Sequence, residues 1–574
     1  MIEKKAQQET FLSRENGLVS KLVCFIVGIV QKVEKIPGKY LEIAACVIYA
    51  IAHLLMAIVH EPWYDEAVAW NIARTASLQD ILFNIPHYEG HPPLWHLVLL
   101  PFAKLGAPYE LSLSIISLIF AGLACSLIIW KAPFPRIIRL LLPFTYFFFY
   151  QYGVISRPYC MMMLAFVLLA MTYTARNEHP VKYTASLAFL CLTSAYGIVI
   201  AGGLAIVWVF EIWNLQKIIP FIKTLPKDKR FWNLLSLLIL ALLLIVEILP
   251  RDDTFATTFT DDAETNSLLF CFSYMLFALP MEVSLSSIYM TVDVLKMVQI
   301  NMLLMLTTCA LGFLFWIIVV MWGKSKNTLL TLIVPYVMFA AFASLVYVNR
   351  HHIGVGLFVF MFWFWITCKT ETENKFMTNW STVNKTTTKN IVVITGTLAM
   401  IVSLYWNMSS CIQDINWDYA AGRYEAQFIK DHHLDEYKIM VAWDIKLDDA
   451  DEIEEMDINH CIYADNVLPY FDHNIFFNFN DGRDDIMYST HKVPSEEYTQ
   501  SHLEEWSKEL PDVCLTYVPL GVYDDVDVKK IYSVVSNDRK NAVWKGTPIY
   551  SRTRIYVRND LLETVGLESI EPVL

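Results

Sequence analysis

Charged residues are scarce in this chain. Asp, Glu, Lys and Arg make up 18% of its 574 residues, whereas about a quarter is usual in soluble domains. Hydrophobic residues make up 55%. This composition excludes a single soluble domain as a description of the whole chain and indicates a membrane protein.

The sequence also lacks the cysteine patterns of metal-binding and redox proteins. Its 11 cysteines are scattered, with no CxxC pair and no Cys/His spacing of a zinc site. Most fall in apolar segments, where cysteine behaves as a small apolar residue. Cys411, Cys461 and Cys514 lie outside those segments, and the sequence does not say whether any two of them form a disulfide.

The apolar residues occur in long blocks, a pattern typical of membrane-spanning helices. A span needs about 20 residues, because each residue adds about 1.5 Å along a helix and the hydrocarbon layer is about 30 Å thick. The sequence therefore predicts a polytopic α-helical membrane protein with about eleven transmembrane helices. The predicted spans lie near 40–60, 111–130, 138–153, 160–175, 183–197, 198–215, 232–250, 301–323, 328–347, 353–370 and 390–407.

Lysine and arginine fall on alternate connections between these spans. They occur before the first span and again near 131–139, 217–230, 324–326 and 375–389. Basic connections stay in the cytoplasm. We therefore expect a multi-pass protein of the cell membrane with a cytoplasmic N-terminus and an extracytoplasmic C-terminal segment.

The chain divides into two predicted domains. Residues 1–407 form the membrane domain, with outer loops at 61–110 and 251–300. Residues 408–574 alternate helical and strand patterns and predict a soluble extracytoplasmic α/β domain. Acids outnumber bases there by roughly two to one, which simple solvation explains better than a cationic ligand.

The first outer loop opens with the stretch His60–Trp70, which reads HEPWYDEAVAW. It places an adjacent acidic pair, Asp65 and Glu66, directly after the first span at the start of a predicted helix. Further along the loop, the apolar part of 87–106 is too short to span. We place it as a helix lying on the outer face of the membrane.

Ionisable residues from four separate loops share one predicted depth, at the outer surface of the membrane. They are His60, Glu61, Asp65, Glu66, His87, Glu89, His91, Arg157, Asp252, Asp253, Arg350, His351 and His352. The middles of the predicted spans are nearly free of charge, whereas an ion-coupled transporter is expected to place acids or bases at the midplane. The pattern favours chemistry at the membrane surface.

Three motifs in this order resemble the GT-C glycosyltransferases. They are the Asp65–Glu66 pair after the first span, HPPL at 91–94, and SRPY at 156–159 after the third span. The likeness is greatest to bacterial enzymes of the protein mannosyltransferase and aminoarabinose transferase type, and is clearest over residues 40–215. It implies a polyprenyl-phosphate-linked sugar donor, transfer on the outer face, and inversion at the anomeric carbon.

The resemblance also implies roles for individual residues. Asp65 is the general base that takes the proton of the acceptor hydroxyl. Glu66 points away from it, since neighbours on a helix do not share a face, and orients the base, binds a sugar hydroxyl or helps hold a divalent ion. The remaining candidates are Arg157, Tyr159, Arg350, His351 and His352 for the donor phosphate, and His87, Glu89 and His91 for substrate.

One departure from the family concerns a metal. Many relatives have an acid where this chain has Tyr159, which weakens the expectation of a two-carboxylate or metal-assisted site. Whether a divalent metal ion takes part stays open. The expected partners are the lipid-linked sugar, an acceptor that is a glycan, a lipid or a protein, and membrane lipids; no nucleic acid is expected.

Each residue alone also has an ordinary explanation. The acidic pair fits a solvated helix start, and Arg350 fits an anchor at the lipid headgroups; only the set favours function. The main alternative is a transporter or flippase of a lipid-linked or envelope substrate. A receptor whose acidic tail binds a ligand and another lipid-sugar enzyme, such as a polymer ligase, are further alternatives.

Overall fold

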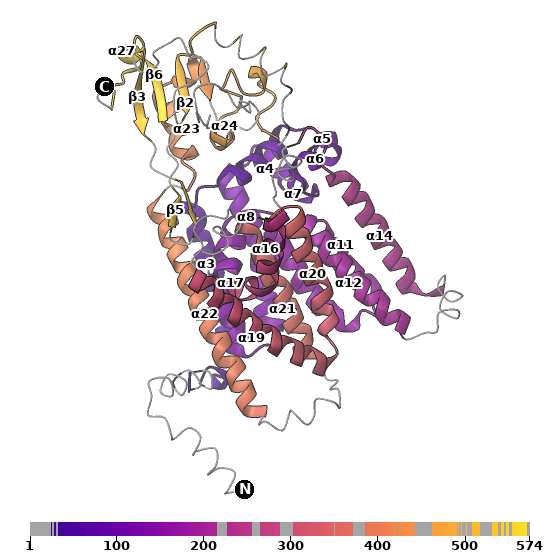
Figure 1. Cartoon of the computed structure of the whole chain (residues 1–574). Coiled ribbons are helices and arrows are strands. Elements are labelled where there is room, and N and C mark those ends of the chain that lie inside the picture. Colours follow the sequence, from indigo (N-terminus) through magenta and orange to yellow (C-terminus); the bar gives the residue numbers. More distant parts are fainter. Residues whose placement is uncertain are drawn as a thin grey trace, which may run out of the picture.

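The computed structural model describes most of residues 25–570. The longer segments outside the described residues are 1–24, 215–226, 255–264, 287–301, 371–384, 442–461, 517–530 and 571–574, and shorter ones lie near 26–31, 349, 418 and 491–553. The described chain is mostly helical. A helix bundle carries a small sheet domain at one end (Figure 1), and we call that end of the bundle the sheet end.

The bundle helices coincide with the predicted spans. They are α3 (Tyr40–Val59), α8 (Tyr109–Lys131), α10 (Tyr159–Thr172), α11 (Pro180–Cys191), α12 (Ala195–Asn214), α14 (Lys229–Ile248), α19 (Met302–Lys326), α20 (Leu329–Leu345), α21 (Gly354–Lys369) and α22 (Lys385–Asn416). Among the described residues, 5 helices are long and apolar enough to cross a membrane, within α3, α8, α12, α14 and α19. The helical membrane class is thus supported, and the count of about eleven spans stays a prediction.

The predicted span at 138–153 is not one regular helix. It consists of α9 (Arg136–Leu141), the 3-10 turn η1 (Leu142–Phe144) and the π-helix η2 (Phe147–Val154). The break follows Pro143, which cannot donate a backbone hydrogen bond. Side chains of neighbouring helices bind the carbonyl oxygens of η2: Ser117 donates to Gly153 at 2.5 Å, and Tyr49 donates to Phe148 at 3.0 Å.

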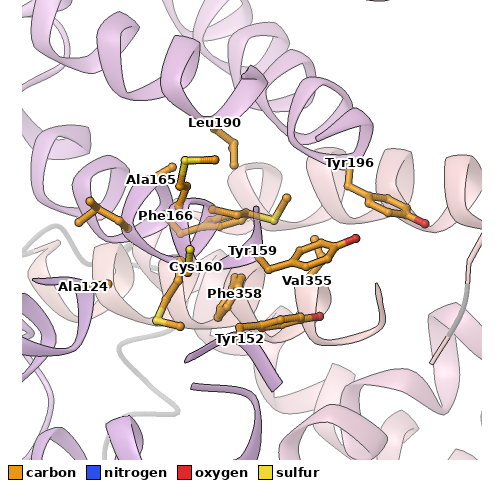
Figure 2. Close-up of a cluster of buried hydrophobic side chains, with 14 of the residues drawn as sticks. Ala124, Tyr152, Tyr159, Cys160, Ala165, Phe166, Leu190, Tyr196, Val355 and Phe358 are labelled. Atoms are coloured by element: carbon orange, nitrogen blue, oxygen red, sulfur yellow. The ribbon is translucent and has the colours of Figure 1, made fainter. Parts of the chain in front are cut away.

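The centre of the bundle is one continuous apolar core. Figure 2 shows part of it, where Cys160 and Phe166 of α10 lie among Ala124, Leu190 and Phe358 from α8, α11 and α21. These side chains are at most 1% exposed. Burying them holds α10 in the middle of the bundle.

The segment 61–110, which the sequence predicts as an outer loop, is made of short helices. It contains α4 (Tyr64–Thr75), α5 (Leu78–Phe83), α6 (Ile85–Glu89) and α7 (Leu94–Lys104), and α7 packs on α4. The capping signal that begins α5 is present, since the Ser77 side chain accepts a hydrogen bond from the Asp80 amide at 3.0 Å. The described part of the segment 251–300, predicted as a second outer loop, contains α16 (Thr265–Phe277) and α17 (Leu279–Leu285).

The C-terminal domain is built on a mixed sheet in the order β1-β2-β6-β3. The strands are β1 (Ile439–Val441), β2 (Val513–Thr516), β6 (Arg554–Arg558) and β3 (Tyr532–Asn537). β1 and β2 are parallel, and the other pairs are antiparallel. Helices α23 (Gly422–Asp431) and α24 (Ile462–Val467) pack with the sheet around a shared apolar core, while the hairpin β4 (Asn541–Trp544) and β5 (Thr547–Ile549) contacts α22.

Two ion pairs join helix ends at the end of the bundle opposite the sheet. Arg136 donates two hydrogen bonds to Glu42 of α3, at 2.6 and 2.8 Å. Arg176 pairs with Glu211 of α12. These pairs fasten the helix ends on that side of the molecule.

Helices α12 and α20 make close contact through a glycine. A Cβ atom on Gly203 would lie 2.7 Å from the Cα atom of Pro335 in α20. Its neighbour Gly202 has more room, because a Cβ atom there would meet only the end of the Met338 side chain, at 3.9 Å. Small residues at such crossings let helix backbones approach in membranes.

We expect Gly203→Ala to lower the free energy of unfolding by about 1–3 kcal/mol, because the added methyl group clashes with the backbone of α20. Gly202→Ala is the matched control, and it should be neutral or more stable by up to about 1 kcal/mol, since alanine favours a helix. Unfolding of the purified protein in detergent measures both. Equal losses in the two variants would contradict the described crossing.

Candidate functional site

Helix α4 begins at the sheet end with the predicted acidic pair. Trp63 stands at its N-cap in an extended conformation, and the Glu66 carboxylate accepts the Trp63 amide hydrogen at 3.1 Å. This is the reciprocal half of a capping box. As expected for helical neighbours, the two acids differ in environment: the Asp65 side chain is 23% exposed and that of Glu66 is fully buried.

The Asp65 carboxylate contacts the guanidinium of Arg157. Arg157 lies in the connection between η2 and α10, and its guanidinium carbon is 5.9 Å from the ring centres of both Trp63 and Tyr159. The structure thus brings together an acidic and a basic side chain, Asp65 and Arg157, that lie far apart in the sequence. The pair is partly buried and lies among aromatic rings. The attraction between its two charges is therefore stronger than in a pair exposed to water.

His351 and His352 lie beside this pair. Their rings are 3.9 Å apart, and the His351 ring is 5.8 Å from Trp63. Burial lowers the pKa of His352, and the charges of His351 and Arg157 lower it further, so His352 is neutral. The backbone of Arg350 forms a 3-10 turn with the two histidines, whereas its side chain lies outside the described residues.

Three tyrosines contact the segment that carries the histidines. Figure 2 shows the rings of Tyr152, Tyr159 and Tyr196 with their hydroxyl groups toward the same side. Tyr152 donates to the His351 carbonyl at 2.5 Å, and Tyr196 donates to the Tyr347 carbonyl at 2.6 Å. These bonds fix the segment that carries the histidines against η2 and α12.

Glu66 belongs to a buried ionic cluster. His60 Nε2 lies 3.3 Å from Glu66, and His60 Nδ1 lies 2.7 Å from Asp414 of α22. Tyr150 of η2 also donates to Asp414, at 3.1 Å. The second oxygen of Glu66 accepts the Ser156 amide hydrogen at 2.5 Å, so the cluster holds the residue directly before Arg157.

The cluster keeps its imidazole charged. Burial alone lowers the pKa of His60, but the carboxylates of Asp414 and Glu66 outweigh it and raise the pKa to about 10. The imidazolium therefore donates to both carboxylates at neutral pH.

Sequence reasoning did not select Asp414 or Tyr150. Asp414 was assigned to the C-terminal domain, but α22 continues through Asn416 and carries it to the sheet end. Its position one to two turns beyond the last predicted span, at the depth of the other acids, was the available signal.

The three predicted substrate-binding residues do not all lie beside Asp65 and Arg157. His87 contacts the end of α14, where its Nδ1 lies 2.7 Å from the Leu249 carbonyl oxygen. The charge of His91 lowers the pKa of His352, whereas the charge of Glu89 raises the pKa of His96 in α7. In the described part of the chain, no three His, Cys, Asp or Glu side chains form a group that could hold a metal ion.

The sheet domain is fastened directly to α4. Arg74 donates to the carbonyl oxygens of Leu468 and Phe471 at 3.0 and 2.7 Å, and Asn71 donates to that of Asp465 at 3.1 Å. On the bundle side, the Glu61 carboxylate accepts backbone hydrogens at the start of α23, including that of Arg423 at 2.6 Å. The helix with Asp65 is therefore held by both domains.

Stability should depend on pH through His60. In the unfolded chain His60 has its ordinary pKa near 6.5 and in the fold about 10, so its contribution is full below pH 6.5 and is lost as the pH rises toward 10. His60→Gln should lose about 3–5 kcal/mol at pH 7, because two buried carboxylates lose the cation between them. Denaturant unfolding at several pH values measures this.

His87, which is half-buried and lies outside the ionic cluster, provides the control. His87→Gln should keep the wild-type pH profile, whereas His60→Gln should lack the decline between pH 6.5 and 10. Parallel profiles for wild type and His60→Gln would contradict an imidazolium in the cluster.

Compared with protein-family models, with curated proteins and with solved structures, the chain shows no match.

Proposed function

We propose that this protein is an inverting glycosyltransferase of the GT-C type. It moves a sugar from a polyprenyl-phosphate donor to an acceptor on the outer face of the cytoplasmic membrane, with Asp65 as general base. In this proposal the N-terminus is cytoplasmic, and the sheet end with the C-terminal domain is extracytoplasmic.

The observation that carries the proposal is the contact between Asp65 and Arg157 beside His351 and His352. Transfer from a lipid phosphate needs a base for the acceptor and a cation for the leaving phosphate. Both lie in one place, at an end of the bundle rather than in its middle. The phosphates of lipids occupy that depth in a membrane.

The chemistry assigns each group one task. The acceptor oxygen attacks the anomeric carbon while Asp65 takes its proton. The bond from that carbon to the phosphate oxygen breaks, and the lipid phosphate leaves with the electron pair. Arg157 stabilises the charge that develops on the phosphate, and Arg350, next to the two histidines in the chain, is a second candidate for this role.

Glu66 acts in this proposal as a positioning residue. Its carboxylate has hydrogen bonds from Trp63, Ser156 and His60, and it is fully buried. These bonds place the start of α4 and the residue before Arg157 relative to each other. Glu66 thus fixes the distance between base and phosphate-binding group instead of contacting the sugar.

Asp65→Asn should lower kcat for transfer by about 10²–10⁴, the usual contribution of a positioned general base. The assay combines purified protein with a panel of polyprenyl-phospho-sugars and with lipid, glycan or protein acceptors. Asp252→Asn is the matched control, since Asp252 is an exposed acid beyond the end of α14, and it should transfer at the wild-type rate.

Equal turnover by Asp65→Asn and wild type would reject the assignment of the base. A wild-type protein that transfers no sugar but moves a lipid-linked sugar between the leaflets of a vesicle would replace the proposal with the transporter alternative.

A further inference from the structure

Two buried tyrosines, Tyr159 and Tyr419, belong to the aromatic surroundings of Arg157. The Tyr159 ring is 5.9 Å from the guanidinium carbon. Tyr419 comes from the connection between α22 and α23, and its ring is 6.3 Å from that of Trp63, which also lies over Arg157. Burial and the carboxylates of Asp414 and Glu66 raise the pKa of Tyr419, and the charge of Arg157 lowers it. Chain segments far apart in sequence thus surround one cation.

Both hydroxyls are buried and have no hydrogen-bond partner among the described residues. Each tyrosine is 1% exposed. A buried polar group without a partner is costly and uncommon in native proteins, which suggests that a bound molecule completes it. Burial raises the pKa of Tyr419, so its hydroxyl keeps the proton and is able to donate.

The guanidinium of Arg157 is already paired with an acidic side chain of the protein. The Asp65 carboxylate contacts Arg157. A carboxylate and a phosphate offer a guanidinium the same feature, which is a pair of oxygen acceptors that share negative charge. Asp65 therefore lies where a phosphate oxyanion would have to bind.

We propose that Arg157, Tyr159 and Tyr419 form a subsite for the phosphate of a lipid phosphate ester, and that Asp65 occupies its cation until that phosphate binds. The inference rests on the proposed function and adds to it a phosphate-binding residue, Tyr419, and an order of events. The phosphate takes Arg157 and accepts hydrogen bonds from the two hydroxyls. Asp65 is then released as a base, so the donor binds before the acceptor can react.

The test measures equilibrium binding of a polyprenyl phosphate without sugar to the full-length protein in detergent. Tyr419→Phe should bind about tenfold more weakly, because it loses one hydrogen bond to a charged group. Asp65→Asn should bind about fivefold more tightly or better, because the competing carboxylate is gone. Arg157→Gln should lose measurable binding.

Two variants are matched controls. Tyr183 also has a buried hydroxyl without a hydrogen-bond partner in the described chain, but it lies against Tyr173 and Trp208, away from Arg157. Tyr183→Phe should bind like wild type. Asp252→Asn removes an exposed negative charge and should also leave the affinity unchanged, which separates a local effect of Asp65 from a change in net charge.

Melting without ligand separates lost binding from misfolding. Tyr419→Phe should melt at the wild-type temperature or above it, since the removed hydroxyl has no partner, and ligand should raise its melting temperature less than that of wild type. Inorganic phosphate is a second arm. Binding that responds to the same variants would support the subsite and show that it recognises phosphate without lipid.

The failures are distinguishable. A wild-type protein that binds neither polyprenyl phosphate nor any polyprenyl-phospho-sugar would overturn the proposed function. Wild-type binding that Tyr419→Phe leaves unchanged would overturn the subsite alone. Affinity that is unchanged or weaker in Asp65→Asn would overturn the role of Asp65 as its occupant.

Discussion

The contact of one imidazolium with two buried carboxylates holds the sheet end together. His60 joins Glu66 at the start of α4 to Asp414 near the end of α22. Buried charges are costly unless each one contacts an opposite charge. The start of α4 and the end of α22 are therefore stable only where the two carboxylates contact the imidazolium. Asp65 follows Tyr64 into α4 next to Glu66, and Arg157 follows Ser156, whose amide Glu66 accepts. The meeting of Asp65 and Arg157 is a consequence of the buried cluster.

Helix α4 also connects the candidate site to the sheet domain. Glu66 binds α4 to the bundle, and Arg74, about two helical turns later near the other end of α4, binds carbonyl oxygens of the sheet domain. Glu61 adds a second junction, because its carboxylate takes up amide hydrogens that the start of α23 leaves unpaired. A movement of the sheet domain would therefore act on the helix that carries the proposed base.

The sequence predicts the helices better than it predicts the site. Span positions follow from local length and hydropathy, and the bundle helices lie where these place them, with a departure where Pro143 and the aromatic run of η2 alter the helix. The sequence supports the site only through a shared predicted depth and a resemblance to a family. Predicted depth gives only the position along the membrane normal and not the position within the membrane plane. It selects Asp65, Arg157 and His351, which lie together, but also His87, which contacts the end of α14. The sequence does not predict Asp414 and Tyr419 as site residues, because the chain is polar from the end of α22 onward. That polarity indicates the C-terminal domain instead.

The separation of His60 from Asp414, 354 positions along the chain, matters for biogenesis. Ribosomes complete the N-terminal partners of the ionic cluster long before α22 emerges. During that interval the imidazole and the Glu66 carboxylate lack their third member, and Arg157 lacks Tyr419. The packing of α22 onto the earlier helices is thus the step that completes the ionic cluster, because only then does Asp414 reach His60 and Tyr150.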